Sequence, residues 1–146
     1  MSETYVPLIS SGTAGPLGVL HLPRLWQKVS LEARGKLNPA YPGLGRGFDA
    51  MTCAALGVDE QAVKDFIKDN KPTYPEFEAW VKENAKSLNP EAIEKHNAAV
   101  RGYEHDAGTR KGIADTCGLD DSSCARDAVN LNNLDDWNEF HQAVLR

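Results

Sequence analysis

The clearest pattern of hydrophobic and polar positions lies between residues 21 and 37, HLPRLWQKVSLEARGKL. Hydrophobic residues recur there at steps of three and four positions, which places them along one side of an α-helix. Pro23 suits the first turn of a helix, and Gly35 is typical of a helix end. The pattern therefore predicts an amphipathic helix over about residues 23–35. Its buried stripe is expected to include Leu22, Leu25, Trp26, Val29, Ala33 and Leu37.

The opposite face of this helix carries charged residues, among them Arg24, Lys28 and Glu32. Arg24 and Lys28 are four positions apart, so their positive charges are neighbours on the helix surface. Pairs of like charge at this spacing are mildly destabilising. The pattern favours an ordinary solvated surface, and the alternative is a patch that faces a bound anion.

Between residues 48 and 103 the chain carries the start signals of four further helices. Side chains that accept hydrogen bonds from free N–H groups favour helix starts, and Thr followed three positions later by Glu forms a capping box. The residues expected to cap these helices are Asp49, Asp59, Thr73 with Glu76, and Asn89. For Asp49 the alternative is a carboxylate that faces the preceding loop. Gly57 is expected to end the first of these helices.

The pattern is weaker after residue 104, where Gly108, Gly112 and Gly118 interrupt it. Short helices are predicted near residues 109–117 and 121–129. A final helix is predicted to begin after Asn133 as its cap. The residues of that helix expected to face inward are Trp137, Phe140 and Val144.

These elements predict the fold class. No segment alternates hydrophobic and polar residues in the way of a β-strand. Residues 1–20 are rich in glycine and proline, which predicts an extended arm without helix. A chain of 146 residues is long enough for one hydrophobic core. We therefore expect an all-α protein: an irregular N-terminal arm over residues 1–20, then a single helical domain over 21–146, a bundle of about six or seven short helices.

Composition excludes several classes of function. A formal net charge of -5 argues against a nucleic-acid-binding protein, because phosphate contacts need a concentrated basic face. No hydrophobic run is long enough to span a membrane, and the N-terminus lacks the features of a secretory signal. The chain has three cysteines, an odd number at unremarkable spacings, which argues against a disulfide framework. A cytoplasmic protein is the expectation.

A small set of polar residues could carry chemistry beside the glycine-rich loop of residues 37–47. The catalytic candidates are His21, Asp49 and His96, and the ligand-binding candidates are Arg24, Lys28 and Asn97. A His–Asp pair can act as a general base with its orienting partner, and Arg and Lys can hold a carboxylate or phosphate. Alternatively, His21 caps the first helix and His96 is a hydrogen-bonded core residue.

Other chemistries fit the sequence less well. The loop contains GLGRG, but a phosphate-binding loop of a βαβ unit needs a preceding strand, and none is predicted. Cys53 falls in a short apolar helix, where a free cysteine behaves as an inert hydrophobic residue. Cys117 and Cys124 do not have the spacing of a zinc site. We expect neither a metal nor a cofactor.

Several segments in order resemble a family of small bacterial proteins classed as a domain of unknown function. They are HLPRL at 21–25, the glycine-rich loop, Phe48-Asp49, the LG-x-D turn of 56–59, and the helix from Asn89 through Asn97. The likeness covers roughly residues 17–103, with a looser match at Asp-Asp-Trp, 135–137. The resemblance implies a cytosolic bacterial helical protein and carries no established reaction. Residues 104–132 match no part of the pattern.

The functional expectation is a non-catalytic binding protein, for either a small anionic ligand or a protein partner. The alternative is a small acid–base enzyme that uses the His, Asp and Arg residues. Convergence of His21, Arg24, Asp49 and His96 around one pocket would favour a ligand site. Scattered side chains or a large exposed apolar patch would favour a protein-binding module. The sequence predicts no oligomeric state.

Overall fold

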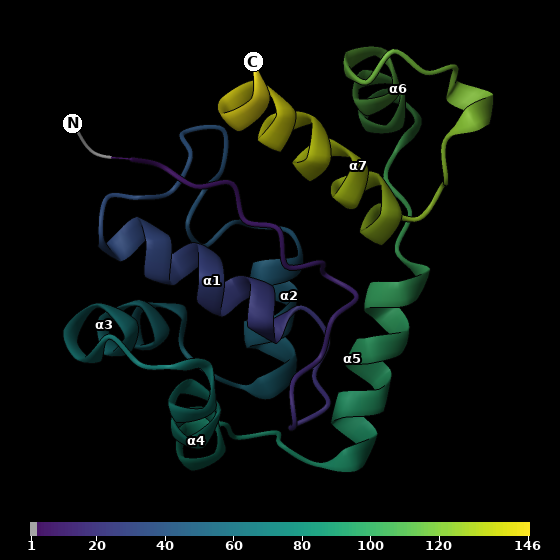
Figure 1. Ribbon diagram of the computed structural model, residues 1–146. Coiled ribbons are helices and arrows are strands. Elements are labelled where there is room, and N and C mark those ends of the chain that lie inside the picture. Colours follow the sequence, from purple (N-terminus) through teal and green to yellow (C-terminus); the bar gives the residue numbers. More distant parts are fainter. Residues whose placement is uncertain (1–2) are drawn as a thin grey trace.

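The computed structural model describes residues 3–146, so the first two residues of the predicted arm lie outside the described part. Residues 3–146 form seven α-helices and no β-sheet, which confirms the predicted all-α fold (Figure 1). The helices are α1 (Leu22–Ala33), α2 (Phe48–Leu56), α3 (Glu60–Asn70), α4 (Tyr74–Asn84), α5 (Pro90–Gly102), α6 (Ala107–Thr116) and α7 (Ala128–Phe140). A 3-10 turn, η1 (Asp121–Ser123), precedes α7, and a π-helical turn, η2 (His141–Leu145), follows it.

Helix α1 lies at the centre of the main hydrophobic core. It packs against α2, α3 and α4. The predicted stripe is largely correct, since Leu22, Leu25 and Val29 are all buried. Trp26 is only partly buried, and its Nε1 donates to the carbonyl oxygen of Pro72 at 3.1 Å. The core is completed by Val19, Cys53, Leu56, Val63, Ile67, Phe77 and Val81.

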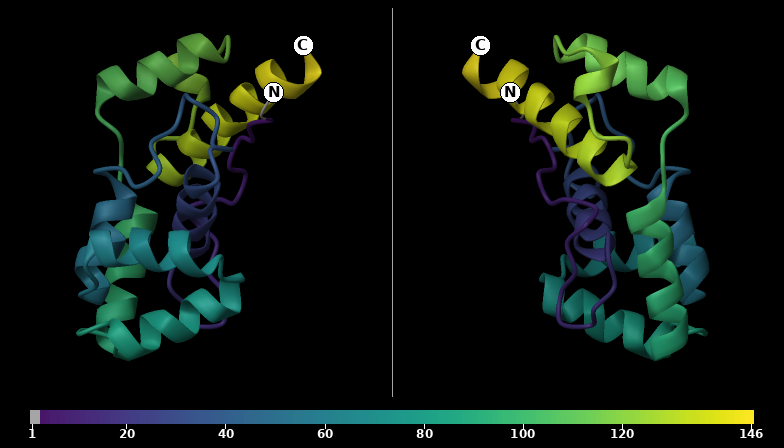
Figure 2. Two further views of the ribbon diagram at one scale, coloured as in Figure 1. Left: turned by 90° about the vertical axis from the view of Figure 1, so that its left-hand side faces the viewer. Right: turned by 90° about the vertical axis from the view of Figure 1, so that its right-hand side faces the viewer.

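A second, smaller core joins α2, α5 and α7. It consists of Leu20, Phe48, Val100 and Ala128. Figure 2 shows that α6 and α7 form one end of the molecule, while α3 and α4 form the other. The start of α2 therefore lies between the central helix and the C-terminal helices, which is where the candidate site is found.

Most of the predicted helix starts are confirmed. Asp59 and Asn89 accept hydrogen bonds as N-caps of α3 and α5, and Thr73 forms a capping box at α4. Gly57 ends α2 in the left-handed conformation, with φ of 69°. The prediction for Asp49 as a cap is wrong, because the N-cap of α2 is Gly47 and Asp49 lies within the first turn.

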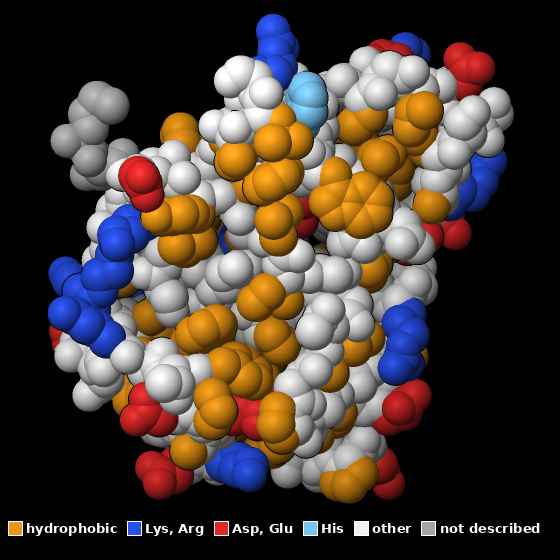
Figure 3. All heavy atoms as spheres, in the orientation of Figure 1, with side chains coloured by type: hydrophobic (Ala, Val, Ile, Leu, Met, Phe, Trp, Pro, Cys, Tyr) orange, Lys and Arg blue, Asp and Glu red, His pale blue; other side chains and the backbone are white. Residues whose placement is uncertain are grey.

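The C-terminal third differs most from the prediction. Residues 121–123 form only a 3-10 turn, so the helix predicted over 121–129 is wrong. Helix α7 begins after Asp127, which caps it, and not after Asn133. The side of α7 that packs inward carries Ala128, Leu131 and Asp136. Trp137 is therefore 61% exposed, contrary to the prediction, as is Val144. Figure 3 shows hydrophobic side chains on the outer surface of α7.

The N-terminal arm contains no helix in residues 3–20, and it packs along the helical part of the chain. Its start is held by two backbone hydrogen bonds, from Tyr5 N to Lys36 O at 2.7 Å and from Asn38 N to Tyr5 O at 3.0 Å. Its end contributes Val19 and Leu20 to the two cores. Within residues 3–146, none of the helices combines the length and the apolar character that a membrane span requires.

Candidate functional site

The candidate site is a cavity of about 290 Å³ between the start of α1, the loop of residues 38–47, the start of α2, and α7. Four of the six residues proposed from the sequence line this cavity. They are His21, Arg24, Lys28 and Asp49. The first three come from α1 and its N-cap, and Asp49 comes from the first turn of α2, so two segments distant in sequence meet at this cavity.

His21 occupies the N-cap position of α1 in the left-handed conformation, with φ of 73° and ψ of -22°. The predicted position at the helix start is confirmed, but the side chain makes no capping hydrogen bond. Instead, its Nε2 lies 2.5 Å from Asp49 Oδ1, and its Nδ1 lies 2.9 Å from Ser11 Oγ. A left-handed backbone costs a non-glycine residue about 1–2 kcal/mol. These two side-chain hydrogen bonds help to hold His21 in that conformation.

Asp49 is the centre of a buried polar cluster. Its Oδ1 bonds His21, and its Oδ2 accepts from Lys28 Nζ at 2.6 Å and from Gly45 N at 2.7 Å. Burial alone raises the pKa of Asp49, but the hydrogen bonds from His21 and Lys28 and the positive charge of Lys28 outweigh it and lower the pKa to about 2. Asp49 is therefore ionised at neutral pH and faces the preceding loop through Gly45, as the alternative from the sequence proposed.

The protonation of His21 follows from its surroundings. Burial lowers the pKa of His21, and this effect exceeds the opposite influence of Asp49. A neutral imidazole has one N–H and one acceptor nitrogen. Because ionised Asp49 can only accept, the proton lies on Nε2. The Nδ1 atom then accepts the hydroxyl hydrogen of Ser11.

Arg24 and Lys28 are buried, which contradicts the predicted solvated surface: they are only 6% and 7% exposed. Arg24 forms a bidentate ion pair with Asp136 of α7, with Nη1–Oδ2 at 2.7 Å and Nη2–Oδ1 at 3.0 Å. Arg24 Nη1 also donates to the carbonyl oxygen of Ile9 at 2.9 Å. The spacing along one helix could not show these partners, since they come from distant segments.

Asp135 and Tyr41 complete the polar wall of the cavity. The Tyr41 hydroxyl donates to Asp136 Oδ1 at 2.9 Å. Burial, together with the negative charges of Asp136 and Glu139, raises the pKa of Asp135 above its usual range. Asp135 thus carries a proton more readily than Asp49 does.

A second cavity of about 460 Å³ adjoins the first. The two cavities share a wall made of Arg46, Gly47, Phe48 and Asn132. The second cavity is mainly apolar, and its further lining includes Met51 and Tyr103. We call the two cavities together the cleft.

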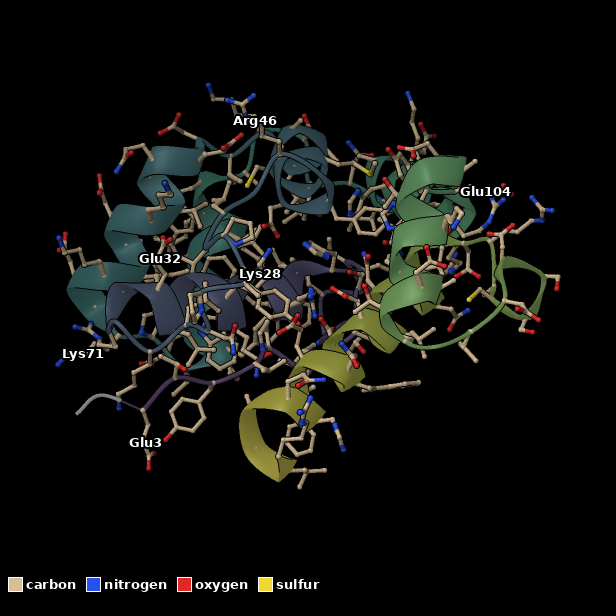
Figure 4. The ribbon with its side chains drawn as sticks, turned by 90° about the horizontal axis from the view of Figure 1, so that it is seen from above. Glu3, Lys28, Glu32, Arg46, Lys71 and Glu104 are labelled. Carbon is tan, nitrogen blue, oxygen red and sulfur yellow. The ribbon has the colours of Figure 1, made fainter. Side chains whose placement is uncertain are left out.

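The wall between the two cavities contains the N-terminus of α2. Gly47 supplies no side-chain cap, so the first N–H groups of α2 have no side-chain partner within residues 3–146. Figure 4 shows Lys28 in the interior on α1 and Arg46 at the edge of the molecule, on the loop before α2.

The loop before α2 is held against α1 by a hydrogen bond from Gly43 N to Glu32 Oε2 at 3.2 Å. A side chain at Gly43 would overlap the Glu32 carboxylate.

His96 and Asn97 do not line the polar cavity. His96 Nε2 lies 3.1 Å from Leu20 O, and Asn97 bonds Leu20 N at 3.0 Å and Gly18 O at 2.8 Å. Both residues therefore fasten α5 to the segment before α1. For His96 this arrangement matches the alternative of a hydrogen-bonded core residue.

The sequence did not indicate Ser11, Tyr41 or Asp136 as site residues. Ser11 and Tyr41 lie in segments without periodicity, and Asp136 falls in the first turn of the helix predicted to begin after Asn133. A buried arginine needs an acidic partner, so the burial of Arg24 would have pointed to one. The sequence did not predict that burial.

The cysteines lie outside the cleft. Cys53 is buried in α2, and burial, with the charges of nearby acidic residues, raises the pKa of its thiol to about 12. Within residues 3–146, no three His, Cys, Asp or Glu side chains gather as ligands for a metal ion.

The comparisons with known proteins place the chain in a family. Among curated proteins, none matches it. A family model described as a domain of unknown function (DUF5069) matches residues 11–139, a range that extends from Ser11 past Asp136 and so contains all the side chains of the polar cluster. The chain therefore belongs to the DUF5069 family.

Proposed function

We propose that the chain binds a small anionic molecule with an apolar part, and that the binding site is the cleft. One observation carries the proposal: a polar cavity and an apolar cavity adjoin along one wall at the start of α2. Ligand sites are typically concave and mostly apolar, with a few polar groups that fix orientation. The apolar cavity offers apolar surface to the ligand, and the polar cavity offers the groups that fix its orientation.

Three groups support the anionic character of the ligand. Lys28 has three N–H donors, and Asp49 is its one partner within residues 3–146, so two donors remain. The N-terminus of α2 presents N–H groups and the positive end of the helix dipole. Arg46 adds an exposed positive charge at the shared wall. Arg24 and Lys28 add little net charge, because Asp136 and Asp49 neutralise them, so Lys28 contributes through its two remaining N–H donors.

The apolar part of the ligand is expected to occupy the cavity beside Phe48, Met51 and Tyr103. Phe48 and Tyr103 rings meet edge to face, with centroids 5.6 Å apart. A planar or aliphatic group placed against such rings gains from burial of apolar surface. We therefore propose a small carboxylate or phosphate with an aromatic or aliphatic body.

A thermal-shift comparison tests this proposal with matched probes. Phenylacetate carries both features, acetate carries only the charge, and phenylacetamide carries only the apolar body. We expect phenylacetate to raise the melting temperature more than either of the other two. At a hundredfold excess over Kd, a ligand stabilises the folded state by about 2.7 kcal/mol.

A matched pair of arginine variants locates the site. Arg46→Ala is expected to weaken the response to phenylacetate, whereas Arg101→Ala, an exposed arginine on α5, should leave it unchanged. An equal response in both variants would show that the probe binds elsewhere. If neither phenylacetate nor phenyl phosphate binds, a protein partner becomes the better hypothesis, and the exposed apolar face of α7 is the surface to test.

The His21–Asp49 pair favours a second candidate function, acid–base catalysis in the same cleft. Both ring nitrogens of His21 are already hydrogen-bonded, so a proton can reach the imidazole only through Ser11 or by displacing it. A loss of turnover in His21→Gln, with binding of phenylacetate retained, would support an enzyme over a binding protein.

We also propose a cytoplasmic location and a bacterial source, as the resemblance implies. The three cysteines support the location, because all are free thiols, as expected in a reducing compartment. Fractionation of the native host would test it.

A further inference from the structure

We propose that Ser11 is a nucleophile and that the cleft hydrolyses esters of small carboxylic acids with an apolar body. Ester hydrolysis is a specific form of acid–base catalysis, the second candidate function described above. It rests on the proposed function because the substrate occupies the same cleft. Its basis is a continuous row of hydrogen-bonded side chains formed by Ser11, His21 and Asp49.

The geometry of the row is that of an activated nucleophile. Ser11 Oγ lies 2.9 Å from His21 Nδ1, and His21 Nε2 lies 2.5 Å from Asp49 Oδ1. A nucleophile bonded to a base, and a base bonded to an orienting acid, are the features that identify such sites. All three residues line the polar cavity. The ring nitrogens are exchanged relative to the familiar serine-protease arrangement, but the roles depend on the tautomer, not on the atom names.

The backbone of His21 gives a second, independent observation. A non-glycine residue with φ of 73° is strained, and strain of this kind is concentrated at functional sites. A regular helix start would place a different residue type at this N-cap, such as Ser or Asp. Here the strained conformation directs the imidazole to Ser11 and Asp49 and leaves the capping role unfilled.

The same cavity offers donors for the negative charge that develops during acyl transfer. Lys28 has two N–H donors beyond its bond to Asp49, and the first N–H groups of α2 open at the shared wall. Donors fixed in advance at the position of an oxyanion make one of the largest contributions to catalysis. The anion site of the proposed function thus serves the oxyanion and, afterwards, the carboxylate product.

The reaction proceeds in two balanced halves. Ser11 Oγ attacks the ester carbonyl carbon while its proton passes to His21 Nδ1, and the carbonyl oxygen becomes an oxyanion. The oxyanion collapses, the bond to the leaving oxygen breaks, and His21 returns the proton to the departing alcohol. Water then attacks the acyl–Ser11 ester, gives a proton to His21, and releases the acid as Ser11 Oγ regains that proton. Water is the only co-reactant.

A fluorophosphonate probe tests the nucleophile directly, because a serine oxygen that displaces fluoride from it forms a stable covalent bond to phosphorus. Intact-mass measurement of the folded protein should show one adduct, and peptide mapping should place it on Ser11. Ser11→Ala should lose the adduct, whereas Ser10→Ala, a change at the neighbouring serine, should keep it. No adduct on folded wild type, or an adduct elsewhere, overturns the proposal, whether or not Ser11→Ala folds.

Hydrolysis and binding are then measured separately, so that the nucleophile proposal and the binding proposal can each be contradicted without the other. Wild type should hydrolyse 4-nitrophenyl phenylacetate at least about a hundredfold faster than Ser11→Ala, while both show the same thermal response to phenylacetate. Equal rates overturn the nucleophile and leave the binding proposal standing. Loss of the phenylacetate response in wild type overturns the binding proposal, and the mass adduct still decides on Ser11.

Discussion

Arg24 and Asp136 form a buried ion pair although 112 positions separate them in the chain. Arg24 lies in the first turns of α1, and Asp136 lies in the second half of α7. Both terminal guanidinium nitrogens, Nη1 and Nη2, bond Asp136, and Tyr41 adds a hydrogen bond to the same carboxylate. Through this pair the C-terminal helix is fastened to the central helix, and the polar cavity acquires its outer wall.

We expect Arg24→Ala to lower the free energy of unfolding by about 3–5 kcal/mol, because it leaves the Asp136 carboxylate buried without its partner. Urea denaturation measures this change. Arg101→Ala, an exposed arginine, should change the stability by less than about 0.5 kcal/mol. A small effect for Arg24→Ala would show that the ion pair is not formed in solution.

Replacement of the whole pair is expected to be much milder than removal of one partner. In the double variant Arg24→Met with Asp136→Leu, neither charge is left alone, and hydrophobic replacements of buried pairs are often neutral or stabilising. We therefore expect the double variant to be more stable than Arg24→Ala in the same urea experiment. Additive losses would contradict the coupling of the two residues.

Asp49 should make stability depend on pH in the acidic range. Its pKa in the folded state is about 2, below the ordinary value of 3.8, so the unfolded chain binds the proton more tightly. The stabilisation is present above about pH 4 and is lost as the pH falls through 2. Urea midpoints from pH 5 to 2 should fall more steeply for wild type than for Asp49→Asn. Asp69→Asn, on the exposed surface of α3, should retain the steep fall.

Cys53 is predicted to resist alkylation in the folded protein. Its thiol is buried and its pKa is raised to about 12, so almost no thiolate exists at pH 8. Iodoacetamide followed by peptide mapping should find Cys53 unmodified in buffer and modified in urea. Rapid alkylation in buffer would show that α2 opens frequently.

The sequence predicted the helices whose signals are local. Caps such as Asp59, Thr73 and Asn89 act within one turn, so the residue types alone place them. The C-terminal helix was harder, because Asn133 and Asp127 are both suitable caps and only packing selects between them. Packing also selects the inward face, which carries Leu131 and Asp136, whereas the sequence assigned Trp137 to the core.

The candidate site was predictable only in part, because residue types can be recognised from the sequence and their distant partners cannot. His21, Lys28 and Asp49 belong to residue types that do chemistry, and they line one cavity, but His96, which the enzyme hypothesis also placed there, lies outside it. Their partners were not predictable, since the contact of Arg24 with Asp136 arises only when α7 folds back on the arm and α1. The burial of two positive charges on one helix face is therefore a property of the assembled fold.

Asn97 separates a structural role from a ligand-binding one. Its side chain bonds both Leu20 N and Gly18 O, and it lies outside the polar cavity. Asn97→Ala leaves a buried N–H and a carbonyl without partners, which costs about 1–3 kcal/mol for each group left unpaired. We expect a lower urea midpoint but the same Kd for phenylacetate as wild type. A weakened Kd with unchanged stability would instead return Asn97 to the set of ligand-binding residues, and would place the ligand against α5.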